Sequence, residues 1–178
     1  MWILSDRRGL ALVVAAGLAA SLFTPAAAAD SNKTCALNGV SIMAFGVYDP
    51  VNDAPLDVEG RIAYRCFVGF NGTSARTTGS LNRQLRSAIN VQISLGSGGS
   101  GGYDRYMSGG RDRLRYNLYL DAQRGQIWGD GTSGTQVYMA AAQPNNHEVI
   151  VPVFGRVFPA QDVSADFYLD QIIVTLDF

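Results

Sequence analysis

The sequence predicts an all-β protein built as an antiparallel sandwich, and three observations support this fold class. Apolar and polar residues alternate in several short runs, which is the period-two pattern of strands with one buried face. Clusters of Gly, Pro, Asn and Asp, the usual turn-forming residues, separate these runs. After position 29, no segment of about a dozen residues carries a clear amphipathic helical stripe. Short strands with regular turns between them are typical of a single sandwich domain.

The first 29 residues have the pattern of a secretory signal peptide. Arg7 and Arg8 make the start positive, residues 9–23 form an apolar run, and residues 25–29 supply small residues for cleavage. The apolar run is shorter than the roughly 20 residues of a membrane-spanning helix. We expect cleavage after Ala29, export through the inner membrane to the periplasm and then the cell surface or medium, and no transmembrane segment in residues 30–178. A retained N-terminal anchor is the alternative.

Charge and length limit the functions that the mature chain can have. The whole sequence has a formal charge of −1, and removal of Asp6, Arg7 and Arg8 leaves −2. Without a basic excess, nucleic acid is not an expected partner. The length of residues 30–178 suits one domain with a full-sized core.

The two cysteines, Cys35 and Cys66, are expected to form a disulfide, because an exported chain meets an oxidising compartment. The bond would close a loop of about 32 residues, worth roughly 3.5 kcal/mol in the chain-entropy model. A structural zinc site is the rival interpretation, but two thiols and one distant histidine are too few ligands.

The alternating runs give seven expected strands. In chain order they cover residues 40–45, 60–68, 88–95, 114–120, 137–142, 148–157 and 172–178. In the second run, Ile62, Tyr64 and Cys66 share one face. The third run has its apolar face at Ile89, Val91, Ile93 and Leu95. In the fourth run the same face holds Tyr116, Leu118 and Leu120, with Asn117 and Tyr119 opposite. The last run alternates in the same way, with Ile172, Val174, Leu176 and Phe178 on one face.

Turn residues and one possible helix lie between these runs. Breakers occur at residues 48–50, 96–102, 109–110, 129–131 and 144–146. Residues 81–89 could form a short helix, since Leu81, Leu85 and Ile89 recur at four-residue spacing. The glycine-rich residues 96–102 are interpreted as a flexible loop, because a phosphate-binding loop needs a following lysine and helix. We expect Trp128 at the margin of the core and the turn at 129–131 directly after it.

Catalytic interpretations find little support. His147 follows a turn and precedes a strand, and no nucleophile motif accompanies it. The aspartates at 49, 53, 57, 130 and 162 occur in turn contexts, where their side chains bond nearby backbone N–H groups. A hydrolase that uses Asp104 or Asp130, or calcium at residues 129–131, stays a minor alternative. We therefore expect no enzyme activity, no metal and no cofactor.

At several places the sequence resembles the spore coat protein U domain family. Residues 45–50 (FGVYDP) follow Cys35, and Cys66 then falls in the next strand. The middle matches at residues 105–107, 114–121 and 128–132, and the end at residues 154–157, 161–163 and 167–170. Within these segments, structural roles are expected for Phe45, Gly46, Tyr48, Tyr116, Tyr119, Trp128, Gly129, Asp130, Gly131, Gly155 and Tyr168.

This family includes pilins of the archaic chaperone–usher pathway, so the resemblance implies an incomplete immunoglobulin-like sandwich that lacks its last strand. It implies that a periplasmic chaperone first fills the vacant groove, that an usher assembles the subunits, and that a neighbouring subunit then supplies the missing strand by strand addition. The alternating strand with Ile172, Val174, Leu176 and Phe178 would contact these partners. An ordinary core strand is the alternative interpretation of that run.

Two features depart from the family pattern. Cleavage after Ala29 leaves only residues 30–34 before Cys35, which is too short and too polar for a donor strand. The chain would then accept a strand without donating one, as a tip subunit does; the alternative is a self-contained secreted coat or polysaccharide-binding module that does not polymerise. Residues 67–87 are also long and basic, with Arg76, Arg83 and Arg86, and form either a solvated insertion or a contact loop.

Overall fold

The computed structural model describes residues 3–6, 33–68, 88–142 and 146–178. Within these ranges the chain forms β-strands, one short 3₁₀ turn and connecting loops, and contains no α-helix. No helix in this part of the chain is long and apolar enough to cross a membrane. The all-β class predicted from the alternating runs is confirmed.

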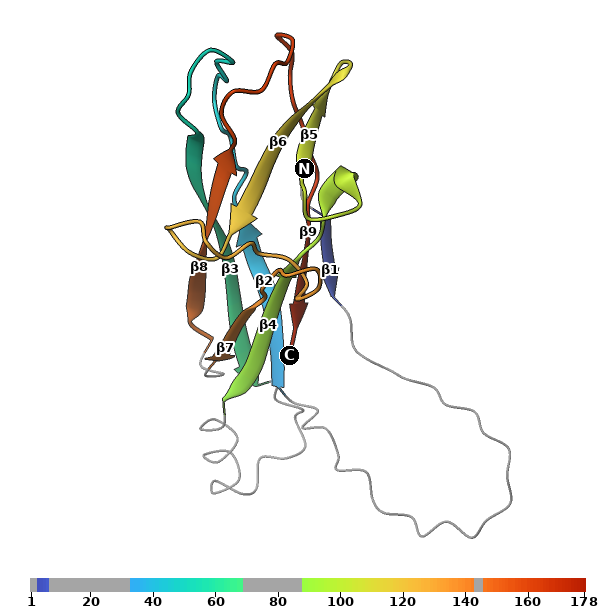
Figure 1. Cartoon of the computed structure of the whole chain (residues 1–178). Helices are drawn as coiled ribbons and strands as arrows, with labels where there is room; N and C mark the ends of the chain where they lie inside the picture. The colour runs from blue at the N-terminus through green and yellow to red at the C-terminus, as the bar shows by residue number, and fades with distance from the viewer. Residues whose placement is uncertain (1–2, 7–32, 69–87, 143–145) are drawn as a thin grey trace, which may run out of the picture.

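Two sheets face each other to form the sandwich (Figure 1). The larger sheet has the order β2-β3-β8-β6-β5. Its strands are β2 (Lys33–Val40), β3 (Leu56–Val68), β8 (Glu148–Val157), β6 (Asp112–Tyr119) and β5 (Tyr106–Gly109), and all of its pairs are antiparallel. The smaller sheet has the order β1-β9-β4-β7. Its strands are β1 (Ile3–Asp6), β9 (Ile173–Asp177), β4 (Ile89–Leu95) and β7 (Tyr138–Ala142).

The first expected strand was wrong. Residues 41–45 do not form a strand, and the ladder instead runs from Lys33 to Val40, with a bulge between Leu37 and Gly39. Sequence reasoning had treated Lys33 and Thr34 as a polar tail. They pair with Val68 and Phe67 because the cross-strand pair of Cys35 and Cys66 fixes the register of β2 on β3.

The other expected strands are present, with shifts of a few residues at most ends. The run at 148–157 matches β8, and β3 begins at Leu56, four residues earlier than expected. Two strands were not expected, β5 and β1. The proposed helix at 81–89 lies outside the described residues up to position 87, and Ile89 belongs to β4.

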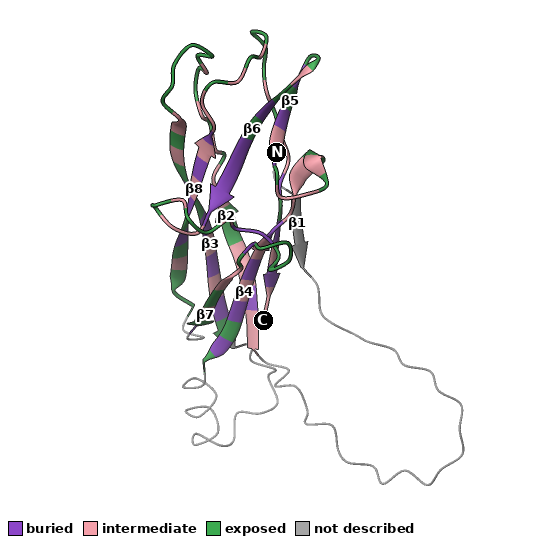
Figure 2. Cartoon of the chain, viewed as in Figure 1, coloured by how far each residue is buried: buried purple, intermediate pink, exposed green. Residues whose placement is uncertain are grey.

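The core lies between the two sheets, where the inward faces of the strands meet (Figure 2). In β4 the side chains at Ile89, Val91, Ile93 and Leu95 are buried, as the alternation predicted. Strand β6 differs, because residues 116–119 are all buried and not only those of one face. Trp128 is fully buried, so its expected place at the core margin was wrong; its indole nitrogen donates to the carbonyl of Ile93 at 2.9 Å.

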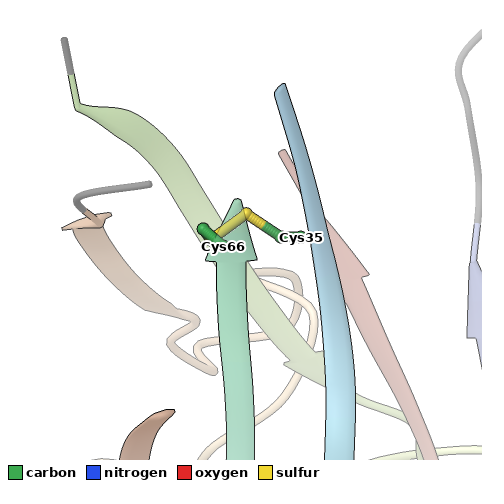
Figure 3. The surroundings of a disulfide bond; sticks show 2 residues. All are labelled: Cys35 and Cys66. Atoms are coloured by element: carbon green, nitrogen blue, oxygen red, sulfur yellow. A yellow bond between two sulfur atoms is a disulfide. The ribbon is translucent and has the colours of Figure 1, made fainter. Parts of the chain in front are cut away.

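The disulfide between Cys35 and Cys66 joins β2 to β3, as predicted (Figure 3). The two residues are directly opposite each other in the antiparallel ladder. Both side chains are buried, so the bond is part of the core.

Near its C-terminus the chain crosses from one sheet to the other. Leu169 forms two backbone hydrogen bonds with Ser108 of β5, at 2.9 and 3.0 Å. Four residues later, the carbonyl of Ile173 accepts from the N–H of Gly96, beside the end of β4. Residues 168–172 therefore bridge the two sheets directly ahead of β9.

Candidate functional site

The outer edge of β9 is the first element of the candidate site. Because Gly96 and Ile173 are joined by a hydrogen bond, alternation in the antiparallel ladder directs the backbone groups of Val174 and Leu176 away from β4. The side chains of these two residues are 0% and 3% exposed, so they face the core. The edge thus offers backbone groups for another strand beside a row of apolar side chains.

The expected inward face of the C-terminal run is present at three of four positions. Ile172, Val174 and Leu176 are buried, while Phe178 is 43% exposed at the chain end. Ile173, on the opposite face, is 44% exposed. The burial pattern agrees with the predicted alternation; the expected contacts with partner subunits stay a prediction.

A strand from the N-terminal segment pairs with this edge. Strand β1 runs parallel to β9, and its register joins Ile3 to Ile173, Leu4 to Val174, Ser5 to Thr175 and Asp6 to Leu176. Figure 1 shows β1 alongside β9, at the edge of the smaller sheet. The edge of β9 can therefore accept an added strand, here from residues that belong to the expected signal peptide.

A pocket lies beside residues 168–172, directly ahead of Ile173, the residue of β9 that pairs with the first residue of β1. It has a volume of about 110 Å³ and lies between residues 42–45, strands β5 and β6, and residues 168–172. Its lining is mostly apolar and consists of Ile42, Met43, Phe45, Met107, Tyr116, Leu118, Tyr168, Leu169, Asp170 and Ile172.

One wall of the pocket is a strand-like segment that belongs to no ladder. From 42 to 46 its residues alternate between exposed and partly buried, but no described strand pairs with them. Met43 and Phe45 lie over Gly155, where an added Cβ would come within 2.7 Å of the Met43 methyl and 2.8 Å of the Phe45 ring. Ile42 lines the pocket and is 84% exposed. The pocket thus lies between residues 168–172 and an unpaired backbone segment.

The floor of the pocket contains a hydrogen bond between Tyr116 and Asp170. The Tyr116 hydroxyl donates to Oδ2 of Asp170 at 2.7 Å, and Oδ1 accepts from the N–H of Gly99 at 2.9 Å. The Tyr116 ring also contacts Phe45 edge to face, with centroids 5.9 Å apart. Burial and the hydrogen bond to Asp170 raise the pKa of Tyr116, so the phenol stays protonated and keeps donating.

Arg105 is a fully buried cation. The sequence places it in a segment that matches the family but indicates no role for it. Its guanidinium donates to Oδ1 of Asn117 at 2.7 Å, to the Trp128 carbonyl at 2.7 Å and to the Gly96 carbonyl at 2.8 Å. The group also lies 4.9 Å from the centroid of the Tyr103 ring. Burial lowers the pKa of Arg105. Because Asn117 is in the larger sheet and Gly96 follows β4, the side chain joins the two sheets.

The remaining family residues support turns and packing. The Tyr48 hydroxyl accepts from the N–H of Gln161 at 2.7 Å and so links two loops. Gly46 and Gly131 have φ values of +85° and +86°, which favour glycine. Asp130 accepts from the N–H of Thr132 at 2.9 Å.

Three further family positions pack closely. A Cβ at Gly129 would overlap the Thr135 side chain. Tyr119 is buried, and Tyr168 is partly buried at the pocket, where its hydroxyl donates to the Ser164 carbonyl at 2.7 Å. The structural roles expected for this set stay a prediction.

The residues considered for catalysis are not brought together. His147 is exposed at the start of β8. Asp104 forms an exposed ion pair with Arg115 at 3.0 Å, and Asp57 pairs with Arg124 and Arg156. Among the described residues, no group of three or more His, Cys, Asp or Glu side chains could hold a metal ion.

Comparison with known proteins identifies a family and a similar fold. No curated protein matches the chain. A chain in the crystal structure of the CsuC–CsuE chaperone–tip adhesion subunit pre-assembly complex, from archaic chaperone-usher Csu pili of Acinetobacter baumannii, has a similar fold, with a TM-score of 0.50 and 14% identity. The similarity covers 82% of this chain and 40% of that one, so the present chain spans less than half of its length. The family model for the Spore Coat Protein U domain matches residues 21–175, and the chain therefore belongs to the spore coat protein U domain family.

Proposed function

We propose that the exported chain is a non-catalytic structural subunit of a surface fibre of the archaic chaperone–usher type, assembled by strand addition at the edge of β9. The observation that carries this proposal is the parallel pairing of β1 with β9, next to an open apolar pocket. In strand addition, backbone hydrogen bonds supply affinity and alternate side chains that enter pockets supply register.

Removal of the signal peptide would make this edge available. With cleavage after Ala29, strand β1 leaves together with the signal peptide, and the backbone groups of Val174 and Leu176 lose their partner. An uncovered apolar edge favours aggregation, so a periplasmic chaperone would have to cover it until assembly at the usher. A neighbouring subunit would then replace the chaperone in the fibre.

We place the subunit at the tip of the fibre. After cleavage at Ala29, Lys33 and Thr34 are the last residues ahead of Cys35, and both are paired with β3. They are therefore not free to complete another subunit. The similarity to a complex that contains a tip adhesion subunit supports the same assignment.

The alternative function is a self-contained secreted coat or polysaccharide-binding module. It would fold as a stable monomer after cleavage and would need no added strand. The two proposals differ in whether the exported chain requires a partner at the β9 edge.

The test uses two exposed apolar residues, one at the pocket and one away from it. The full chain is exported to the periplasm together with the chaperone of its own chaperone–usher system, as wild type, Ile42→Asp and Val47→Asp. Ile42 lines the pocket and is 84% exposed, whereas Val47 is 90% exposed and does not line it. Both substitutions should leave folding intact because neither residue is in the core.

We expect a one-to-one chaperone complex for the wild type and for Val47→Asp. Ile42→Asp should lose most of the complex, because insertion of a strand would bury the new carboxylate against apolar side chains. Equal complex yields for all three chains would contradict the proposed site. A monodisperse wild-type monomer that forms without the chaperone would favour the self-contained module.

A further inference from the structure

The pocket ahead of β9 stays open although its lining is mostly apolar, and this raises the question of what holds it open. Apolar walls tend to close on each other, because burial of their surface is favourable. Here the two sheets meet at the pocket through polar contacts of Asp170. This residue accepts from Tyr116 of β6, in the larger sheet, and from the N–H of Gly99, in the turn that follows β4 of the smaller sheet.

These contacts fix Asp170 from three sides. Besides Tyr116 and Gly99, the N–H of Gln171 donates to Oδ1 of Asp170 at 2.8 Å. Gly98 has a φ of +68°, and a Cβ at this position would overlap the Asp170 carboxylate. The turn of residues 98–100 is therefore shaped around this side chain, and a larger residue at position 98 would push it away.

We propose that the Tyr116–Asp170 hydrogen bond is a positioning device that holds the pocket open for one bulky apolar side chain of the incoming strand. This inference rests on the proposed function, since it assigns a residue pair and a side-chain class to the same strand-addition site. The volume of about 110 Å³ is comparable to the roughly 150 Å³ of an engineered cavity that binds benzene. An aromatic or large aliphatic side chain fits such a space.

Position along the added strand follows from the register of β9. The buried side chains in and directly before β9 are Ile172, Val174 and Leu176. Of these, Ile172 lines the pocket. The selected side chain is therefore the one that comes opposite Ile172. Residues farther along the strand face Val174 and Leu176, which do not line the pocket.

The test refolds the exported chain, which has lost residues 1–29 and therefore strand β1, with synthetic peptides of alternating valine and threonine, flanked by lysines for solubility. One phenylalanine is moved through the inward positions of the peptide, and a peptide with glycine at the same position is the reference. Affinities are measured for the wild type, Tyr116→Phe and Tyr168→Phe. Tyr168 is the matched control, because it lines the same pocket but its hydroxyl donates to the Ser164 carbonyl and not to Asp170.

For the wild type we expect one peptide position at which phenylalanine binds about tenfold or more tightly than glycine, from the burial of one aromatic side chain. Tyr116→Phe should reduce this preference to about twofold, while Tyr168→Phe keeps it. A purely structural role for Tyr116 would weaken both peptides equally and leave the ratio unchanged. That outcome, or an equal loss of the ratio in both variants, would overturn the inference.

A second variant changes the Tyr116–Asp170 contact through the turn of residues 98–100. Gly98→Ala should move Asp170 and lower the phenylalanine preference as Tyr116→Phe does, and a retained preference would contradict the assignment. If the wild type binds none of the peptides, the proposed strand-addition function itself fails. If the wild type binds with a position preference that no variant changes, the function stands and only the positioning role is wrong.

Discussion

Replacement of Arg105 by methionine is the sharpest test of how the two sheets are held together. Methionine keeps much of the volume of the arginine stem but removes the guanidinium. The side chain of Arg105 is fully buried, and its hydrogen bonds go to the neutral oxygens of Asn117, Trp128 and Gly96. Its effect on stability therefore depends on hydrogen bonds to neutral acceptors.

The magnitude follows from the acceptors that the substitution leaves behind. The carbonyls of Gly96 and Trp128 lose guanidinium donors at 2.8 and 2.7 Å, and Asn117 loses one at 2.7 Å. A buried acceptor without a partner costs about 1–3 kcal/mol. Asn117 keeps a bond from the N–H of Leu118, so two carbonyls dominate. Part of this cost is offset because the buried charge is also removed, and we expect a loss of about 3 kcal/mol.

The assay is reversible urea unfolding of the full chain, followed by tryptophan fluorescence and by circular dichroism. Arg113→Met is the control, since Arg113 is exposed and lies 4.4 Å from the centroid of the Tyr106 ring; its loss should change the free energy of unfolding by less than about 1 kcal/mol. If Arg105→Met were as stable as Arg113→Met, the sheets would not depend on this cation. The loss of stability assigned to the unpaired carbonyls of Gly96 and Trp128 would then be wrong.

Three further predictions concern the core, the wall of the pocket and an ion pair. Replacement of both Cys35 and Cys66 by serine should lower the free energy of unfolding by about 3 kcal/mol, measured by urea unfolding without reductant; no change would contradict a closed disulfide. Gly155→Ala should cost about 1–3 kcal/mol because its Cβ would meet Met43, and thermal unfolding checks this loss. The hydrogen bond from Arg156 lowers the pKa of Asp57, so its contribution to stability is present above the unfolded-state pKa near 3.9 and is lost as pH falls through the lower folded-state value. Between pH 2 and 6, the free energy of unfolding should therefore change less with pH for Asp57→Asn than for the wild type.

Alternation in the sequence was sufficient to predict the sandwich, because period-two burial leaves a direct trace in each strand. The run at 172–178 shows this well, since its inward residues up to Leu176 are those that the pattern indicated. The same rule failed at residues 41–45. These residues alternate as a strand does, and Met43 and Phe45 lie over Gly155, but residues 42–45 form no ladder with a described strand. A single sequence shows which side chains face inward and not whether a backbone partner exists.

The polar interior could not be predicted for a related reason. Apart from the bond between Asp170 and its neighbour Gln171, the side chains of Arg105 and Asp170 meet partners that lie 9 to 71 residues away along the chain. In the sequence, Arg105 lies between Asp104 and Tyr106, a context that is equally typical of a solvated surface residue. Only the crossing of the chain between the sheets, with Leu169 on β5 and Ile173 beside Gly96, brings these side chains together. The pocket depends on that crossing and therefore had no local signal.

The edges of the two sheets differ in a way that makes β9 the best candidate for strand addition. Open strand edges invite pairing with other chains, and proteins usually protect them with bulges, short strands or covering segments. Strand β2 has a bulge between Leu37 and Gly39, and β5 is partly covered by Leu169. Strand β9 carries no bulge in its ladder with β4, and a pocket extends its line. Its cover in the full chain is β1, which is lost if the signal peptide is cleaved. Protection of this edge would then have to come from another polypeptide, and that requirement links the fold to assembly.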